Sequence, residues 1–457
     1  MSSNSHSSSS HANASHSPTI TVEALRVGMF IHLDGGWLSH PFARSSFRIA
    51  QAQQIVTLRS LGMTRVRWSP ELSEWQDEAV VAGTVVASGA ASQAAAAGPA
   101  ATVAAASNGV VVAAAAGHAQ LARERESLAQ CQRQFDEAAQ AWRGLCHQLQ
   151  GDPEGARDAA LAVAAAFTDK LTTDGEVGIR LLPGAGTDRA AAHALNVTVV
   201  AMLLARTLGV SRTELAELAL GALLHDIGKM ELPERVRHLE VGCTAAETAA
   251  YREHVARGVA AARRMGLPEG ALTAIAQHHE QADASGFPQR LGGDRMTLAA
   301  RILAIVNRYD NLCNPPTRTP PLTPHEAVAM LFAQGRSRYD AAVLNSFIRM
   351  MGVYPAGSLV QLTDERYAMV VAANSTRPLK PRVLVHEPKV PRHEALLLDL
   401  QSEPDLGIRR SIGAAKVPLA ALQYLDPRPR VAYFFEPLAA PAAQAAQAAP
   451  RGESVPA

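Results

Sequence analysis

A histidine and an aspartate stand side by side, as His225 and Asp226, in the run LHDIGK at residues 224–229. The run closes an apolar stretch that is typical of a buried helix, and Gly228 marks the helix end. An imidazole and a carboxylate at one helix end can bind the same metal ion. On its own, the pair is explained equally well as a polar helix terminus.

Four more histidines occur in the same part of the chain: His193, His254, His278 and His279. Any one of them alone is more often a packed or surface residue than a ligand. Five histidines and an aspartate in one helical region are hard to explain by packing. Imidazole with carboxylate is the ligand set of iron, manganese, nickel or zinc, and a carboxylate shared by two ions permits a dinuclear site.

The elements that must position these side chains are helices, which the sequence pattern predicts over residues 156–349. Gly209 is expected to end one of them. Two pairs have the spacing of capping boxes at the start of further helices: Ser211 with Glu214, and Thr244 with Glu247. The region is therefore predicted to be all-α.

These residues resemble a known family. His193, the His225–Asp226 pair and the downstream histidines are similar to the motifs of the HD superfamily of metal-dependent phosphohydrolases. The run HHEQADASGFP at residues 278–288 resembles the HHE…DGxGYP signature of the HD-GYP subgroup, which hydrolyses the bacterial messenger cyclic di-GMP. The resemblance covers roughly residues 187–347. Residues 20–68, with VGMFIHLD, WLSHPF and SF, resemble the small domain that often precedes HD-GYP domains.

The resemblance implies a role for each matching position. Two divalent ions, iron or manganese, would be bridged by Asp226 and held by His193, His225, Asp226, His254, His278, His279 and, more weakly, Asn307. Lys229 would face the scissile phosphate and act in catalysis together with Asp226. Gly286, Phe287 and Pro288 would form part of the substrate wall, where an aromatic ring can contact a guanine.

The chain departs from the family pattern at the later metal ligands. The family's aspartate in a segment like DxYDAL is Asn307 here, in the run NRYDNL, and a neutral amide binds a metal ion less strongly than a carboxylate. Asp310 matches the second aspartate of that motif, and it is open to two interpretations, a structural cap or a substitute ligand. Arg189 stands where some members carry a glutamate for a third metal, which argues against a trinuclear site.

Further departures affect substrate binding. The family's Arg-Pro-Tyr-basic stretch is PPTR at residues 315–318, so only Arg318 could supply its positive charge, from a shifted position. Ala284 replaces a signature glycine. Phe287 replaces a tyrosine, which removes a hydroxyl group but keeps the ring.

Three functions remain open from the sequence. The first is a metal-dependent phosphodiesterase that hydrolyses cyclic di-GMP to the linear dinucleotide or onward to GMP. The second is a degenerate HD-GYP domain that binds nucleotide or protein partners and signals without turnover. The third is hydrolysis of another phosphorylated nucleotide. The retained metal residues and Lys229 favour the enzyme, whereas Asn307 and the altered phosphate stretch favour the binding module.

Composition excludes other classes. The chain has 457 residues and a formal charge of +1, so no net field favours DNA or an anionic membrane surface. Residues 79–117 carry no charge, but they lack Leu, Ile and Phe, which favours a low-complexity linker over a membrane span. Four separated cysteines and an N-terminus without signal-peptide character predict a cytoplasmic protein.

The predicted fold class is mainly α, with a multi-helix HD-type domain between a small α+β domain and a small β-rich domain. The α+β domain is expected to have a compact core filled by aromatic residues. The predicted segments are a disordered tail (1–17), the α+β domain (18–78), an Ala-rich linker (79–118), a connecting helix (119–155), the HD-GYP-like domain (156–350), the β-rich domain (351–436) and a disordered tail (437–457). The connecting helix has an apolar face, which is the basis for a homodimer hypothesis.

Overall fold

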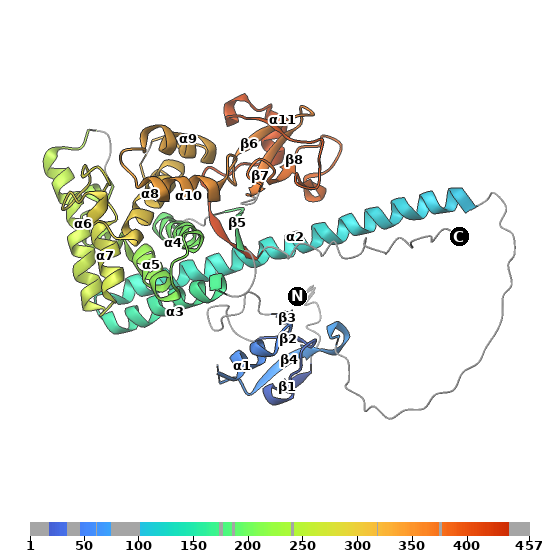
Figure 1. Cartoon of the computed structure of the whole chain (residues 1–457), viewed down its shortest axis with the longest axis horizontal. Helices are drawn as coiled ribbons and strands as arrows, with labels where there is room; N and C mark the ends of the chain where they lie inside the picture. The colour runs from blue at the N-terminus through green and yellow to red at the C-terminus, as the bar shows by residue number, and fades with distance from the viewer. Residues whose placement is uncertain are drawn as a thin grey trace, which may run out of the picture. The chain divides into compact units, whose positions relative to one another are not determined.

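A computed structural model gives the structure of the protein (Figure 1). It describes residues 18–33, 46–60, 62–74, 101–172, 177–184, 188–238, 242–317, 319–373 and 377–437. The predicted tails (1–17, and the chain after Pro437) and residues 79–100 of the predicted linker lie outside the described residues. The chain divides into two compact units, Met1–Thr102 and Val103–Ala457.

The described part of the first unit is an antiparallel sheet with one helix. Its elements are β1 (Thr19–Thr21), β2 (Phe30–His32), β3 (Ser46–Arg48), α1 (Ala52–Ser60) and β4 (Arg65–Ser69), in the sheet order β1-β4-β2-β3. Its core is aliphatic, with Ile31 and Leu58 fully buried, while Phe47 and Trp68 pack against it only partly buried. The prediction of an aromatic core is wrong for the described residues, because aliphatic side chains take the buried positions.

The second unit contains the helical region. Its described helices are α2 (Ala101–Gln148), α3 (Pro153–Thr172), α4 (Arg189–Thr207), α5 (Arg212–Leu224), α6 (Ala245–Arg264), α7 (Glu269–Gln277), α8 (Leu298–Cys313), α9 (Pro324–Gln334) and α10 (Ala341–Met351). Both predicted capping boxes are present, at the starts of α5 and α6. Gly209, with φ of 75°, follows the end of α4 as predicted.

Helix α4 is the core of the helical region. It packs against α5, α8 and α10, and most of its side chains are buried. It is the one described helix that is long and apolar enough to cross a membrane, and 78% of its apolar window is buried inside the protein. Its place in the core explains its apolar composition.

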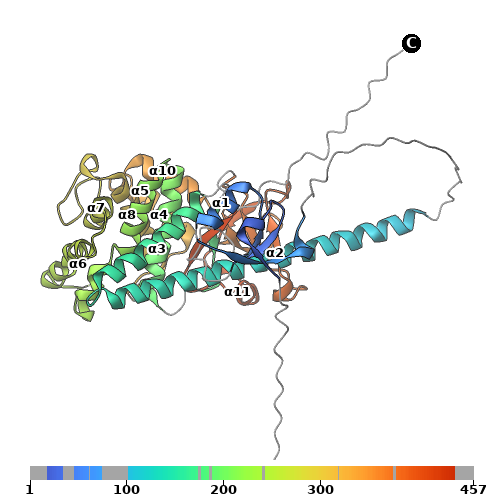
Figure 2. The same ribbon diagram turned by 90° about the horizontal axis from the view of Figure 1, so that it is seen from below.

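The long helix α2 lies beside α3 (Figures 1 and 2). Phe135, Trp142 and Leu145, on its predicted apolar face, are buried in the chain itself. The indole N–H of Trp142 donates to the carbonyl of Leu223 at 3.0 Å, next to the end of α5. The helix begins at Ala101, within the predicted linker.

A second sheet joins the two ends of this unit. Its described strands are β5 (Val177–Leu181), β6 (Leu359–Leu362), β7 (Tyr367–Ala372), β8 (Arg382–Val385), β9 (Leu396–Asp399), β10 (Ile408–Ser411) and β11 (Tyr433–Pro437), with α11 (Leu419–Leu425) packed on β7. The main strand order is β10-β6-β7-β5-β11. Strand β5 lies in the region that the sequence predicts as helical, because five alternating residues are too few to stand out among helices. The predicted fold class is confirmed.

Close backbone contacts bring the end of α5 against its neighbours. Gly228 lies in the turn η4 (Ile227–Glu231), and a Cβ atom there would lie 2.0 Å from the carbonyl oxygen of His254 on α6. A Cβ at Gly221 would lie 2.6 Å from the Cβ of Ala274, where α5 packs on α7. These glycines therefore let three histidine-bearing segments meet.

Candidate metal centre

Three of the site histidines share one local geometry. The Nδ1 atoms of His225, His254 and His278 each donate to the backbone carbonyl three residues earlier, at 2.7, 2.6 and 2.7 Å. A bond to a carbonyl fixes the proton on Nδ1 and leaves a bare lone pair on Nε2. Each ring is therefore held in the tautomer that binds a metal through Nε2.

Asp226 lies between two pairs of histidines. Its Oδ2 lies 3.6 Å from Nε2 of His193 and 3.5 Å from Nε2 of His225. Its Oδ1 lies 3.6 Å from Nε2 of His254 and 3.7 Å from Nε2 of His278. The carboxylate is thus shared by two sets of donors.

Two potential metal-binding groups result, and in each the donor atoms lie within 4.8 Å of one another. The first group is His193, His225 and Asp226, and the second group is Asp226, His254, His278 and His279. The structure thus brings together all six histidine and aspartate residues that the sequence singled out.

The donor set fits divalent metal ions. Among the described residues, Asp226 Oδ1 and His279 Nε2 are buried without a hydrogen-bond partner. Buried polar atoms are almost always paired, so two unpaired donor atoms in one group indicate a cation site. Nitrogen and carboxylate donors are the set that divalent transition metals prefer.

Burial sets the protonation states of the site. It lowers the pKa of His225 and His279 well below the ordinary value and lowers the pKa of His254 to about 4. Burial alone would raise the pKa of Asp226, but Lys229 and His225 outweigh it and hold that pKa well below its usual range. At neutral pH the imidazoles of His225, His254 and His279 are therefore neutral and the Asp226 carboxylate is ionised, and these are the forms that bind metal.

Lys229 lies beside the shared carboxylate. Its Nζ donates to Asp226 Oδ2 at 2.6 Å and lies 5.3 Å from the ring centroid of Tyr251. Burial would lower the pKa of Lys229, yet Asp226 and Tyr251 together raise it above the ordinary value. A protonated ammonium group therefore stands next to the two metal-binding groups.

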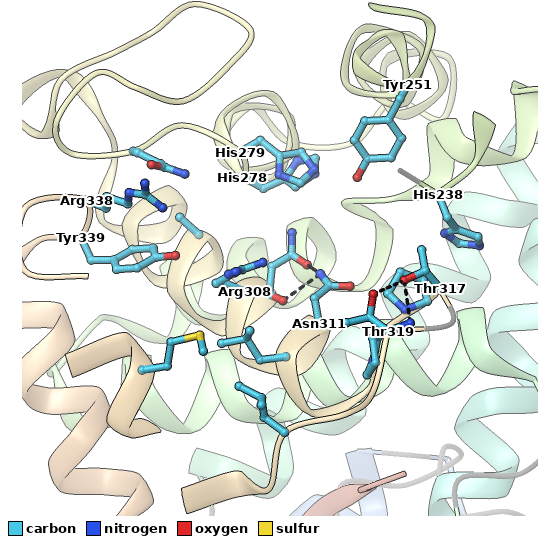
Figure 3. A pocket seen from close by; sticks show the side chains of 18 of the residues that line it. His238, Tyr251, His278, His279, Arg308, Asn311, Thr317, Thr319, Arg338 and Tyr339 are labelled. Atoms are coloured by element: carbon cyan, nitrogen blue, oxygen red, sulfur yellow. Dashed lines mark hydrogen bonds between the residues drawn. The ribbon is translucent and has the colours of Figure 1, made fainter. Parts of the chain in front are cut away.

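A cavity of about 630 Å³ opens beside the second group (Figure 3). That volume is within the range of small-ligand sites. His278 and His279 form part of its wall, together with Lys229 and a larger set of side chains that includes His238, Tyr251, Arg308, Arg338 and Tyr339. Figure 3 shows Arg338 and Tyr339 at the left of the view and Tyr251 and His238 at the right.

Asn307 is buried on α8 and lines the same cavity. Its amide oxygen accepts a hydrogen bond from Nδ2 of Asn311 at 2.6 Å. Because an amide oxygen has a second lone pair, this bond leaves room for a metal contact. Asn307 as a weak ligand stays a prediction.

Asp310, which the sequence left open to two interpretations, lies against a histidine of the first group. Its Oδ2 lies 2.6 Å from Nδ1 of His193, so the carboxylate orients a metal-site histidine. Its Oδ1 accepts hydrogen bonds from Asn196 and Asn314. The role depends on a contact between α4 and α8 that no local pattern reveals.

The loop predicted as a substrate wall, at residues 286–288, packs on His279. The ring of Phe287 stacks on that imidazole with centroids 4.4 Å apart, and the buried Glu280 accepts the backbone N–H groups of Gln289 and Leu291, which follow the loop. Among the described residues, those that line the cavity do not include Gly286, Phe287 or Pro288. A contact between these three residues and the substrate stays a prediction. Arg318 lies outside the described residues.

Ala284 adopts a left-handed conformation, with φ of 61°, at the position of a signature glycine. We expect Ala284→Gly to raise the free energy of unfolding by about 0.5–1 kcal/mol in urea denaturation, because glycine avoids the steric cost of this conformation. Ala282→Gly, in the same loop without a positive φ, is the control and should lower stability. An Ala284→Gly variant less stable than the parent would contradict this expectation.

Several residues that line the cavity or contact Asp310 were not singled out from the sequence: Asn196, His238, Tyr251, Arg308, Asn314 and Arg338. Arg308 directly follows Asn307, so the altered motif itself was a signal for it. The others lie in segments without a recognisable pattern, and only the tertiary fold brings them to the site.

Comparison with known families agrees with this geometry. Residues 179–343 match the HD domain family, and residues 17–160 match a domain of unknown function, DUF3391. The HD match contains every histidine of the two groups, so the potential metal centre lies in the part of the chain that matches the HD domain. Together with the HHE run that ends in Gly286-Phe287-Pro288, these matches support an HD-GYP-type protein whose N-terminal part matches DUF3391.

Three known proteins illustrate the similarity. A cyclic di-GMP phosphodiesterase of Pseudomonas aeruginosa is 30% identical over 198 residues, which are 42% of this chain and 47% of that protein. A 3'3'-cGAMP-specific phosphodiesterase of Vibrio cholerae is 32% identical over 151 residues, 33% of this chain and 29% of that protein. The solved structure of an HDG"Y"P protein from Bdellovibrio bacteriovorus covers 72% of this chain and 97% of its own, with 13% identity and a TM-score of 0.38. The matches span less than half the length of the two phosphodiesterases.

Proposed function

We propose that this chain is a metal-dependent phosphodiesterase that hydrolyses cyclic di-GMP to the linear dinucleotide, or onward to GMP, at a dinuclear site. The observation that carries the proposal is the Asp226 carboxylate, whose two oxygens lie 3.5–3.7 Å from the nitrogens of two different histidine pairs. One carboxylate shared in this way suits two cations that act on one phosphodiester. The names of the relatives support a cyclic dinucleotide as the substrate class.

The first and second groups would each hold one divalent ion, iron or manganese, with Asp226 between them. When bound, the ions supply Lewis-acid activation of the phosphodiester and of the attacking water. The protonated Lys229 would stabilise charge that develops on the phosphoryl oxygens or protonate the leaving oxygen. Its contact with Asp226 keeps it at the site in the absence of substrate.

The cavity offers a place for the second phosphate of a cyclic dinucleotide. Arg308 and Arg338 line the cavity, and no described residue forms a salt bridge with either guanidinium. Guanidinium groups bind phosphate through paired, charge-assisted hydrogen bonds. These two arginines would therefore supply the positive charge that the family's basic stretch provides elsewhere.

Arg308→Ala and Arg338→Ala are each expected to raise the KM for cyclic di-GMP by about 10-fold with a smaller change in kcat, since a hydrogen bond between charged groups contributes about 1.5–3 kcal/mol. Steady-state kinetics measure both constants. Arg349 is an exposed arginine on α10, so Arg349→Ala is the control, and its KM and kcat should equal those of the parent. Unchanged KM values in both cavity variants would place substrate binding elsewhere.

A second candidate function is a binding module that holds cyclic di-GMP without cleaving it. Asn307 favours it, because a neutral amide already bonded to Asn311 replaces the family's metal aspartate. The relative specific for 3'3'-cGAMP keeps a different cyclic dinucleotide open as the substrate.

Product analysis tests the proposal. Protein purified without oxygen and loaded with iron or manganese is incubated with cyclic di-GMP and, separately, with 3'3'-cGAMP. We expect linear dinucleotide or GMP from cyclic di-GMP, and no product after removal of the metal by a chelator. Bound but intact cyclic di-GMP would favour the binding module, and cleavage of 3'3'-cGAMP alone would reassign the substrate.

We also propose a cytoplasmic location and association with a second copy or a signalling partner. All four cysteines are free thiols, which suits a reducing compartment. Phe135, Trp142 and Leu145 are buried within the chain, so a dimer contact on α2 would use residues that precede them. Light scattering on the full chain measures the mass in solution, and a monomer would contradict the homodimer.

A further inference from the structure

His193 is held differently from the other histidines of its site. His225, His254 and His278 donate through Nδ1 to carbonyl groups of their own local backbone, which alone fixes those rings. His193 lies inside α4, and its Nδ1 lies 2.6 Å from a carboxylate oxygen of Asp310 on α8. The orientation of this ring therefore depends on how Asp310 is held.

Asp310 is buried and fixed at both oxygens. While Oδ2 faces His193, Oδ1 accepts hydrogen bonds from Nδ2 of Asn196 at 2.9 Å and from Nδ2 of Asn314 at 2.8 Å. The carboxylate cannot rotate without leaving one of these buried groups unpaired, which is unfavourable. The two amides thus determine where the carboxylate points.

The same two amides bind the backbone that leads into β11. Both donate to the carbonyl oxygen of Val431 at 3.0 Å. The amide oxygen of Asn314 accepts the N–H of Val431 at 2.9 Å, and that of Asn196 accepts the N–H of Tyr433 at 3.0 Å. Each amide therefore uses both N–H groups and its oxygen, so neither can turn without breaking contacts to Asp310 and to the C-terminal segment.

Strand β11 is also anchored at its other end. It pairs with β5 over five residues. Glu436 accepts hydrogen bonds from Arg180 at 3.2 Å, from Arg382 at 2.6 Å and from Ser127 of α2 at 3.0 Å. The segment that holds the amides thus leads into a firmly paired strand, and it lies beyond residue 343, where the HD domain match ends.

We propose that residues 431–433 position the metal ligand His193 through Asn196, Asn314 and Asp310. The C-terminal strand then sets the metal affinity of the first group, whereas the second group is independent of it. The inference rests on the proposed metal site and assigns the C-terminal region a part in it. Asn196, Asn314 and Asp310 are positioning residues, since they act through His193.

Stepwise titration with cobalt(II), followed by its visible absorption, tests the inference. Asn314→Ala removes both contacts to Val431 and one to Asp310, and it should weaken one of two cobalt affinities by about 10–100-fold while the other stays at the parent value. Tyr433→Phe is the matched control. It loses the hydroxyl contacts to Tyr309 and Ala356 from the same strand but none to Asp310, so both affinities should match the parent.

A His193→Ala background separates positioning from a general loss of stability. There the first group is already impaired, so adding Asn314→Ala should leave the remaining cobalt affinity unchanged within about 2-fold. The inference would be overturned if Asn314→Ala weakened the remaining cobalt affinity of the His193→Ala variant. It would also be overturned if Asn314→Ala alone weakened both cobalt affinities equally or changed neither. If the parent protein binds no metal, both the proposed function and this inference are wrong. If the parent binds two ions and Asn314→Ala binds them equally well, only this inference is wrong.

Discussion

Asp226→Asn is expected to lower cyclic di-GMP hydrolysis by roughly 10³-fold or more and to remove at least one bound metal ion. Asparagine keeps the shape of the side chain but loses the charge and one of the two oxygens. Those oxygens face different histidine pairs at 3.5–3.7 Å, so no single neutral oxygen can serve both groups. Lys229 also loses its 2.6 Å partner, which should release the ammonium group from the site.

Metal content and steady-state hydrolysis, measured on the same preparation, check this expectation. Asp405→Asn makes the same chemical change at an exposed position and should leave both quantities at the parent level. An Asp226→Asn variant that retains two metal equivalents and the parent rate would show that the carboxylate is not shared between the ions.

Asn307→Asp should have the opposite effect, with metal affinity and turnover both raised by about 10–100-fold. The change places a charged oxygen in the wall of the cavity that His278 and His279 also line. It is also compatible with the local structure, because an aspartate at this position can still accept the hydrogen bond from Asn311. The expected gain is therefore electrostatic and needs no rearrangement of α8.

Asn345→Asp, on an exposed face of α10, controls for the added charge alone. Metal titration and initial rates under limiting metal give the comparison. If Asn307→Asp binds metal no better than the parent, residue 307 does not contact the ion, and the departure from the family pattern has no bearing on turnover.

The residues of the two potential metal-binding groups could be singled out from the sequence, because the His225–Asp226 pair and the HHE run at residues 278–280 are recognisable locally. The His225–Asp226 pair ends an apolar helix, and the capping box at Ser211 fixes where that helix begins. The local carbonyl contacts that fix three imidazoles follow from such short-range geometry. Local rules are sufficient where one stretch of backbone sets the orientation of the side chain.

The support of His193 could not be predicted from the sequence. It depends on contacts of α4 with α8 and with a C-terminal segment that lies more than 230 residues after α4 in the chain. None of these contacts follows a helical or strand period. Strand β5 was missed for the same reason, since its five residues form a strand only by pairing with β11 and β7. Such long-range partners are settled by tertiary packing.

The most direct test of the dinuclear phosphodiesterase is metal stoichiometry measured beside cyclic di-GMP hydrolysis, on protein purified without oxygen and loaded with iron or manganese. The double variant His225→Ala/Asp226→Ala serves as the negative control. We expect about two ions per chain and turnover in the parent, with both lost in the double variant. A parent that binds two ions and cyclic di-GMP without cleaving it, while Asn307→Asp gains turnover, would contradict the enzyme and identify a binding module.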